Sequence, residues 1–291
     1  CIVCTRCLWL RRCQLGGHTV ARWLVCSSWW RSFGTVLCRV RLAVGPTLSR
    51  TSWSRQARQL TVLHSMPMVP RLVFPPYPVT ELRNIDYILI SHDHRDHCDK
   101  KTIRQLLQVN PKAQILTALG MERTIKSWIG DAPMQTAGWY QRFATPAHEP
   151  QLTFLPTRHW SRRGLFDFNR VLWGSFLFEH QGKRHFFGGD SAYQWPFADI
   201  GTRFPGIDLA MLAIGAYAPD FMMQGAHMNP DEALTAWQEL GAQRMVPMHY
   251  GTYDLSNEPI SEPIRRMKKN AVAEGRRDDL IVPAVNQVVY L

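Results

Sequence analysis

One seven-residue stretch constrains this chain more than any other feature: Ser91-His92-Asp93-His94-Arg95-Asp96-His97. It carries three imidazoles and two carboxylates in the pattern H-x-H-x-D-H, and it directly follows the apolar, β-rich run at 85–90. A loop just past a buried strand is where open α/β sheets place their sites. Imidazole and carboxylate suit zinc and other borderline divalent metals. We therefore predict a metal-binding loop; the alternative, a polar surface loop that is rich in His by chance, fits this density poorly.

From residue 71 onward the chain reads as an α/β protein. Helices are expected at 100–109 and 121–129, between strands at 85–90 and 113–117, which favours parallel pairing. The second half is richer in strands, expected at 151–155, 172–178, 184–187, 207–214 and 244–248. One more helix is expected from Asn229 to Leu240, because Asn229 can cap it, Pro230 fits the first turn and Glu232 completes a capping box.

Metal-type residues recur where these strands end. The H-x-H-x-D-H loop follows the first strand, Asp190 follows Gly188-Gly189 at the end of another, and His249 follows the last. His159 comes after a fourth strand. Residues dispersed in sequence but placed at strand ends can converge on one edge of a sheet sandwich. This gives a set of candidate ligands for two ions: His92, His94, Asp96, His97, His159, Asp190 and His249.

The front of the chain has a different composition. Residues 1–80 hold 11 Arg, six of the seven Cys and five of the 11 Trp, with no Asp, Glu, Lys or Asn. One interpretation is an Arg-rich targeting segment of the mitochondrial type. The other is translation in the wrong frame, joined to a genuine frame between about Met66 and Glu81, and the composition favours it. We expect residues 1–70 to be an atypical basic segment that is not natively folded, and residues 71–291 to form the functional domain.

Charge and hydropathy limit the partners. The net charge of +11 belongs to the front segment, because residues 81–291 hold 23 basic and 23 acidic side chains. A neutral body argues against a nucleic-acid partner. Beyond Cys38 only Cys98 remains, which fits a reducing compartment. Since no apolar run reaches the roughly 18 residues of a membrane span, we expect no transmembrane helix and a cytoplasmic or peripherally membrane-associated protein.

Residues from about 71 to 262 resemble the metallo-β-lactamase-fold hydrolases. H-x-H-x-D-H is typical of that superfamily as a whole. Other segments resemble, more narrowly, the N-acylphosphatidylethanolamine-hydrolysing phospholipase D branch and its bacterial relatives. They are Pro156-Thr-Arg-His-Trp-Ser161, Leu172-Trp-Gly-Ser175, Gly189-Asp-Ser191, Ile214-Gly-Ala-Tyr217, His227-Met-Asn-Pro-Asp-Glu-Ala233 and Met248-His-Tyr-Gly-Thr252.

The resemblance implies a four-layer αββα sandwich with two zinc ions at one edge. It implies one ion on His92, His94 and His159, and the other on Asp96, His97 and His249. Asp190 would bridge the two ions, and His227 would lie beside them on the substrate side. Catalytic roles would fall to Asp96, Asp190 and His227, with Asp96 orienting a hydroxide that the two metals share or taking its proton.

The implied reaction is hydrolysis of a phospholipid at the phosphodiester bond on the headgroup side, which releases phosphatidic acid and an N-acylethanolamine. A phospholipid or other small-molecule substrate and peripheral membrane contact are expected; the oligomeric state stays open. The alternatives are an ester or lactone hydrolase of the same fold, or an inactive product of a disrupted reading frame. The family opens with strands that carry a Gly-His turn and an Asp-Pro. Here only Gly17-His18 resembles the turn and no Asp precedes Asp86, so we expect N-terminal strands that are missing or scrambled.

Overall fold

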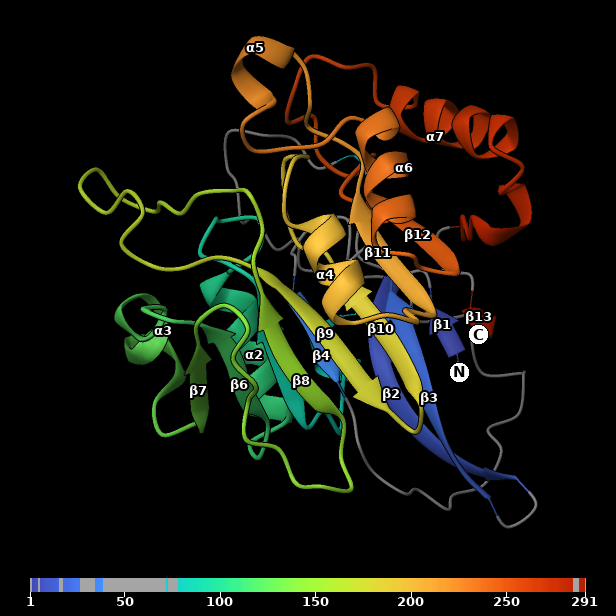
Figure 1. Cartoon of the computed structure of the whole chain (residues 1–291). Helices are drawn as coiled ribbons and strands as arrows, with labels where there is room; N and C mark the ends of the chain where they lie inside the picture. The colour runs from blue at the N-terminus through green and yellow to red at the C-terminus, as the bar shows by residue number, and fades with distance from the viewer. Residues whose placement is uncertain are drawn as a thin grey trace, which may run out of the picture.

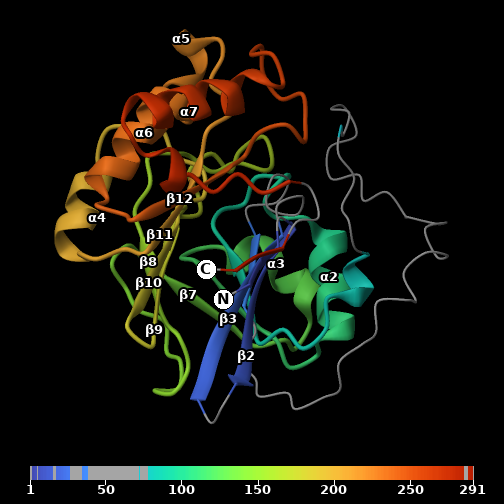
Figure 2. The ribbon, with the colours of Figure 1, turned by 90° about the vertical axis from the view of Figure 1, so that its right-hand side faces the viewer.

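The computed structural model describes residues 2–4, 6–15, 18–26, 35–38, 72, 78–284 and 288–290. Two sheets of this part pack face to face, with helices on their outer sides (Figures 1 and 2). The expected αββα sandwich is thereby confirmed. The expectation that residues 1–70 are not natively folded falls largely outside the described residues and stays a prediction.

The first sheet has the strand order β4-β5-β6-β7. Its strands are β4 (Thr35–Cys38), β5 (Tyr87–Ile90), β6 (Gln114–Ala118) and β7 (Met134–Ala137). β5, β6 and β7 are parallel, whereas β4 pairs antiparallel with β5. Parallel neighbours need crossover connections, and α2 (Lys100–Val109) and α3 (Glu122–Ile129) supply them. The Asp99 carboxylate starts α2 by accepting the N–H of Thr102 at 2.8 Å.

The second sheet has the order β12-β11-β10-β9-β8. Its strands are β8 (Gln151–Leu155), β9 (Ser175–His180), β10 (Lys183–Phe187), β11 (Leu209–Ala213) and β12 (Arg244–Met248). Its helical segments are α4 (Phe197–Arg203), α5 (Asp220–Met223), α6 (Pro230–Glu239), α7 (Glu262–Ala273) and the short η2 (Arg277–Asp279). The capping box that Asn229 and Glu232 predicted is present at the start of α6. Figure 2 shows α4, α6 and α7 on the far side of this sheet from α2 and α3.

Four further strands form a third sheet. β1 (Ile2–Cys4), β2 (Arg6–Leu15) and β3 (His18–Cys26) pair with the C-terminal β13 (Val288–Tyr290) in the order β13-β1-β2-β3. A short 3-10 turn, η1 (Val79–Glu81), leads into the sandwich. No helix in the described part of the chain combines the length and the apolarity needed to cross a membrane.

The second sheet is buried on both faces. Phe176 and Met211 point into the core between the two sheets, whereas Leu177 and Leu212 point into the core beneath the helices. Because successive strand residues face opposite sides, a sheet covered on both faces needs continuous apolar runs. This explains the unbroken apolar sequence around β11. Trp237 of α6 is fully buried in the helix-side core.

The strand expected at 172–178 begins later, at Ser175. Its first residues bond to loops instead of continuing the ladder with β8. The N–H of Gly174 donates to Ser91 O at 3.1 Å, and the N–H of Leu172 donates to Leu119 O at 2.8 Å. The indole N–H of Trp173 donates to Thr157 O at 3.0 Å. These contacts tie the start of β9 to the segments that follow β5, β6 and β8.

Gly189, just past β10, packs closely against this junction. Its φ is +57°, and a Cβ there would lie 2.9 Å from Gly174 O and 3.2 Å from the Cβ of Ser91. A larger residue would therefore be strained in its backbone and would also collide with the chain behind the H-x-H-x-D-H loop. Gly182 in the β9–β10 turn also has a positive φ, +75°, but a Cβ there would meet nothing within 4 Å.

We predict that Gly189→Ala destabilises the protein more than Gly182→Ala. Both changes carry the backbone strain of a left-handed alanine, about 1 kcal/mol or more, but only Gly189→Ala adds a collision with backbone. Denaturant unfolding of the two variants measures the difference, with Gly182→Ala as the matched control. Equal losses of unfolding free energy would contradict the close approach at Gly189.

Candidate metal centre

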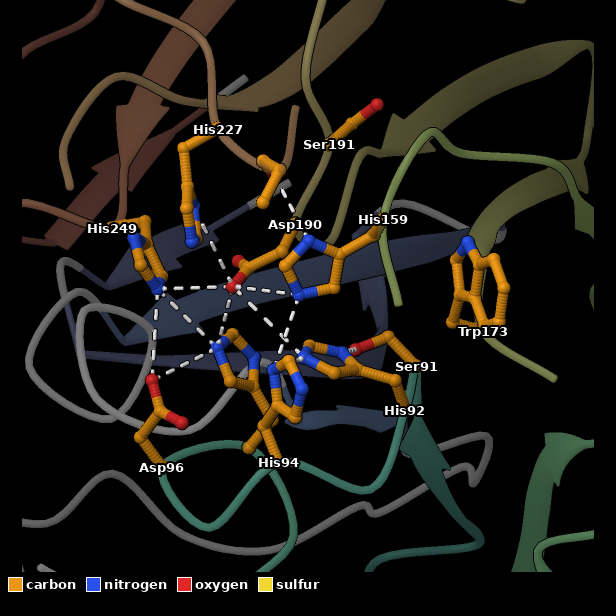
Figure 3. Close-up of polar contacts among 12 residues, drawn as sticks. Ser91, His92, His94, Asp96, His159, Trp173, Asp190, Ser191, His227 and His249 are labelled. Carbon is orange, nitrogen blue, oxygen red and sulfur yellow. Dashed lines mark hydrogen bonds and ion pairs between the residues drawn. The ribbon is translucent and has the colours of Figure 1, made fainter. Parts of the chain in front are cut away.

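The structure brings all eight predicted site residues to one place, at the ends of strands from both sheets (Figure 3). The loop between β5 and α2 supplies four of them, and segments after β8, β10 and β12 supply one each. The last lies between α5 and α6. In chain order they are His92, His94, Asp96, His97, His159, Asp190, His227 and His249.

Three imidazole nitrogens form the first group. Nε2 of His92 lies 3.0 Å from Nδ1 of His94, and Nε2 of His159 lies 3.1 Å from the same atom. A neutral imidazole has one donor and one acceptor nitrogen, so three nitrogens that face one another cannot all be satisfied by sharing protons. A cation placed among them satisfies all three lone pairs.

The second group contains a carboxylate and two rings. Nε2 of His97 lies 3.1 Å from Oδ2 of Asp96 and 3.3 Å from Nε2 of His249. The gap between His249 Nε2 and Asp96 Oδ2 is 3.7 Å. His249 has φ +57°, a left-handed conformation that costs a non-glycine residue about 1 kcal/mol or more. This strained backbone directly follows β12 and turns the ring towards Asp96.

One oxygen of Asp190 joins the two groups. Its Oδ2 lies 3.0 Å from His97 Nε2 and 3.3 Å from His249 Nε2 in the second group. The same oxygen lies 3.9 Å from His92 Nε2 and 3.8 Å from His159 Nε2 in the first. Figure 3 shows these contacts converging on it. This oxygen therefore lies between the two groups; the bridging role that the resemblance implies stays a prediction.

Burial and charge act on these groups in opposite directions. Burial lowers the pKa of His92 and of His159 well below the ordinary value. Burial alone would also lower the pKa of His97, but the carboxylates of Asp190 and Asp96 outweigh it and raise this pKa to about 9. Conversely, burial would raise the pKa of Asp190, and the rings of His249 and His97 hold it well below the usual range. The carboxylates of Asp190 and Asp96 are thus ionised at neutral pH and available to cations.

The residues present fit a pair of divalent ions. The donors are imidazole nitrogens and carboxylate oxygens, the set that borderline metals prefer. Oδ1 of Asp190 and Nδ1 of His227 are buried without a hydrogen-bond partner in the described part of the chain. Buried polar atoms are nearly always paired, so these orphaned atoms indicate that the site serves ligands other than protein.

Two contacts outside the cluster fix the rings. Nδ1 of His159 lies 2.9 Å from Ala226 O, so it must carry the proton, which leaves the Nε2 lone pair free for a metal. The hydroxyl of Ser91 lies 3.0 Å from Nδ1 of His92. Of the other two carboxylates near the loop, Asp93 accepts the N–H of Arg162 and Asp99 caps α2.

His227 and Trp160 line the open side of the centre. The His227 ring stacks on His249 with centroids 5.3 Å apart, and its Nδ1 lies 3.9 Å from Asp190 Oδ2. Its side chain is 12% exposed, against 2% for Asp190. The Trp160 ring packs edge-on against His94 with centroids 4.2 Å apart. His227 thus packs beside the metal-type residues; the substrate contact that the resemblance implies for it stays a prediction.

Other thiol and imidazole side chains lie outside the metal-type groups. Cys98 follows His97 but is fully buried and belongs to none of the metal-type groups, and burial raises the pKa of its thiol to about 12. His148, His180 and His185 also lie outside these groups. Sequence reasoning missed Arg163, whose guanidinium contacts the backbone behind the ligands. No motif signals such a contact, because it depends on how two distant loops fold together.

Comparison with known proteins identifies the family. Residues 52–250 match the model of the beta-lactamase superfamily domain. An uncharacterized protein of Mycobacterium tuberculosis is 35% identical over 226 residues, which cover 75% of this chain and 58% of that protein. The N-acyl-phosphatidylethanolamine-hydrolyzing phospholipase D 1 of Caenorhabditis elegans is 30% identical over 203 residues, or 67% of this chain and 57% of that protein. The chain thus spans a little over half the length of these relatives.

The solved structures show the same fold. The crystal structure of isothiocyanate hydrolase from Delia radicum gut bacteria aligns with a TM-score of 0.60 at 18% identity, over 76% of this chain and 82% of that one. The matched family means that the chain belongs to the metallo-β-lactamase superfamily, and its fold and its His/Asp cluster agree with this.

Proposed function

We propose that the protein is a zinc-dependent phosphodiesterase of the phospholipase D type, acting on N-acylphosphatidylethanolamine-like lipids. The observation that carries the proposal is the position of Asp190 Oδ2 between two groups of metal-type ligands. The substrate class is supported by the name of the Caenorhabditis elegans relative and by the branch motifs that surround the ligands in this sequence.

Zinc suits the donors better than harder cations do. Calcium and magnesium prefer all-oxygen shells, whereas each group here has at least two imidazoles. When bound, a zinc pair supplies Lewis acidity and lowers the pKa of water towards neutrality. The chain's own part is to hold the rings of His92 and His159 neutral and to keep the carboxylates of Asp96 and Asp190 ionised. His227 and Asp96 would face the reacting centre as a substrate contact and a proton acceptor.

A lipid substrate is supported by apolar side chains on two protruding segments. In the loop after His159, Leu165 is 77% exposed and Phe166 is 90% exposed. On α5, just before His227, Phe221 and Met222 are exposed as well. Both segments extend away from the sandwich in Figure 1. Exposed apolar tips beside a site are typical of peripheral membrane contact, and the neutral charge of residues 81–291 favours lipid over nucleic acid.

The bond that is cleaved distinguishes this proposal from the other hydrolases of the fold. Hydrolysis of N-acylphosphatidylethanolamine in ¹⁸O-labelled water should place the label in the phosphate of phosphatidic acid, because water replaces the ethanolamine oxygen at phosphorus. Mass spectrometry of the lipid products measures this. Label in a free fatty acid would instead show an esterase, and turnover of lactones alone would show a lactonase. A chain with neither metal nor turnover would support the disrupted reading frame.

Removing the bridging carboxylate should abolish the centre. We expect Asp190→Ala to lose bound zinc and to reduce kcat/KM roughly a thousandfold or more, since metal stabilisation of the transition state is worth several kcal/mol and 1.36 kcal/mol is tenfold. Elemental analysis and hydrolysis of a chromogenic phosphodiester measure the two effects. Asp199→Ala is the matched control, because that carboxylate binds Tyr140 and Arg203 on the surface. Full activity in Asp190→Ala would refute the proposal.

Zinc affinity should rise with pH. Zinc needs neutral imidazoles, but in the metal-free chain Asp190 and Asp96 raise the pKa of His97 to about 9 from 6.5. The protonated ring stabilises the metal-free fold fully below pH 6.5, and this contribution is lost as the pH rises through 9. Zinc therefore displaces a proton from this ring, and its affinity should increase with pH up to about 9. Calorimetry in buffers of different ionisation enthalpy counts the proton; an affinity independent of pH would contradict the coupling.

A further inference from the structure

One guanidinium nitrogen contacts three backbone carbonyls of the metal-binding loop. Nη1 of Arg163 donates to Asp93 O at 2.5 Å and to Cys98 O at 2.7 Å, and it lies 3.5 Å from His94 O. Asp93 and Cys98 flank the segment 94–97, which supplies three of the predicted ligands. Arg163 thus spans the base of the loop that presents them.

The loop needs such a partner. Within it, the N–H groups of His97 and Cys98 both donate to His94 O, at 3.1 and 2.8 Å, which closes a tight turn. This turn leaves the carbonyls of Asp93 and Cys98 directed at the same point. Asp93 and Cys98 are buried, and a buried carbonyl without a donor is costly. A charged donor forms shorter and stronger bonds than a neutral one, so Arg163 both satisfies these oxygens and holds them together.

Arg163 is itself held in place. Its N–H and that of Gly164 donate to the carboxylate of Asp167, the latter at 2.8 Å. The neighbouring Arg162 N–H donates to the Asp93 carboxylate at 3.0 Å, which adds a second link between the two loops. The guanidinium carbon lies 5.0 Å from the ring centroid of Trp128, within the range of a cation–π contact.

We propose that Arg163 is a positioning residue of the metal centre. It lies four residues after His159, so it clamps the loop that carries His94, Asp96 and His97 to the segment that carries His159. One side chain thereby sets the spacing between ligands of both predicted ions. Nη1 alone makes these contacts, and the planar guanidinium stacked on Trp128 fixes its position, whereas a lysine ammonium at the end of a flexible stem would be held less rigidly. The inference rests on the metal centre alone, so it holds whatever the substrate is.

The sign of the effect separates positioning from electrostatics. Arg163 carries a positive charge near a cation site, so removing that charge should by itself strengthen zinc binding. If the clamp positions the ligands, its removal should instead weaken binding. Residues that orient ligands from outside typically contribute about tenfold to a hundredfold in metal affinity. A loss of this size in Arg163→Met therefore identifies a geometric role.

The test compares three full-length variants with the wild type: Arg163→Met, Arg163→Lys and Arg162→Ala. The last is the matched control, because the Arg162 guanidinium is exposed and, among the residues that the structure describes, donates to Gly164 O alone. Zinc dissociation constants come from competition with a chromogenic chelator, and the absorption bands of the cobalt-substituted proteins report ligand geometry. We expect zinc affinity about tenfold to a hundredfold lower in Arg163→Met, an intermediate loss in Arg163→Lys, and wild-type affinity and bands in Arg162→Ala.

Each other outcome counts against the inference. Wild-type zinc affinity and cobalt bands in a folded Arg163→Met would overturn it, even with a lower melting temperature, because the residue would then support only the fold. If Arg163→Met does not fold, Arg163→Lys decides, and unchanged affinity and bands there overturn the role of the guanidinium. Equal losses in Arg162→Ala would assign the effect to charge or to the loop in general. A wild-type chain that binds no zinc would refute the metal centre itself.

Discussion

A carboxylate buried among imidazoles is the interaction on which the rest of this structure depends. Asp190 is 3% exposed, and an ionised carboxylate at such depth is tolerated only beside positive charge. In the metal-free chain the rings of His97 and His249 provide that charge by taking up protons. Divalent ions provide it more strongly and free the rings to act as ligands. The site is thus arranged so that protons and metals compete for one set of atoms.

The strands deliver these ligands because of how they are buried. β10, β11 and β12 are parallel and covered on both faces, so their side chains are occupied by core packing along the whole strand. Polar chemistry is then restricted to the ends, where the chain leaves the two cores. Glycine at 189 and the left-handed His249 are the local adjustments that turn the chain at these ends towards the centre. Helices cover the outer faces of the two sheets, and loops form the edge that carries the ligands.

Much of this could be predicted from the sequence, because the relevant signals are local. The H-x-H-x-D-H loop, the apolar runs and the capping box at Asn229 each lie within a few residues of one another. The late start of β9 could not be predicted, since Gly174 bonds to Ser91 across more than 80 positions. The same holds for the carbonyl of Ala226 that sets the His159 tautomer, and for Arg163. Contacts of backbone with distant side chains leave no pattern in a single sequence.

The origin of the ligands in both sheets has a mechanical consequence. Four come from the loop after β5 of the first sheet, and three follow strands of the second. Ions bound there would therefore link the two sheets, because they would be coordinated by residues from both. Any ligand that binds only the folded state adds RT ln(1 + [L]/Kd) to its stability, about 4 kcal/mol at a thousandfold excess over Kd. The concentration of free metal in the cell would then affect the folding stability of the chain as well as its catalytic rate.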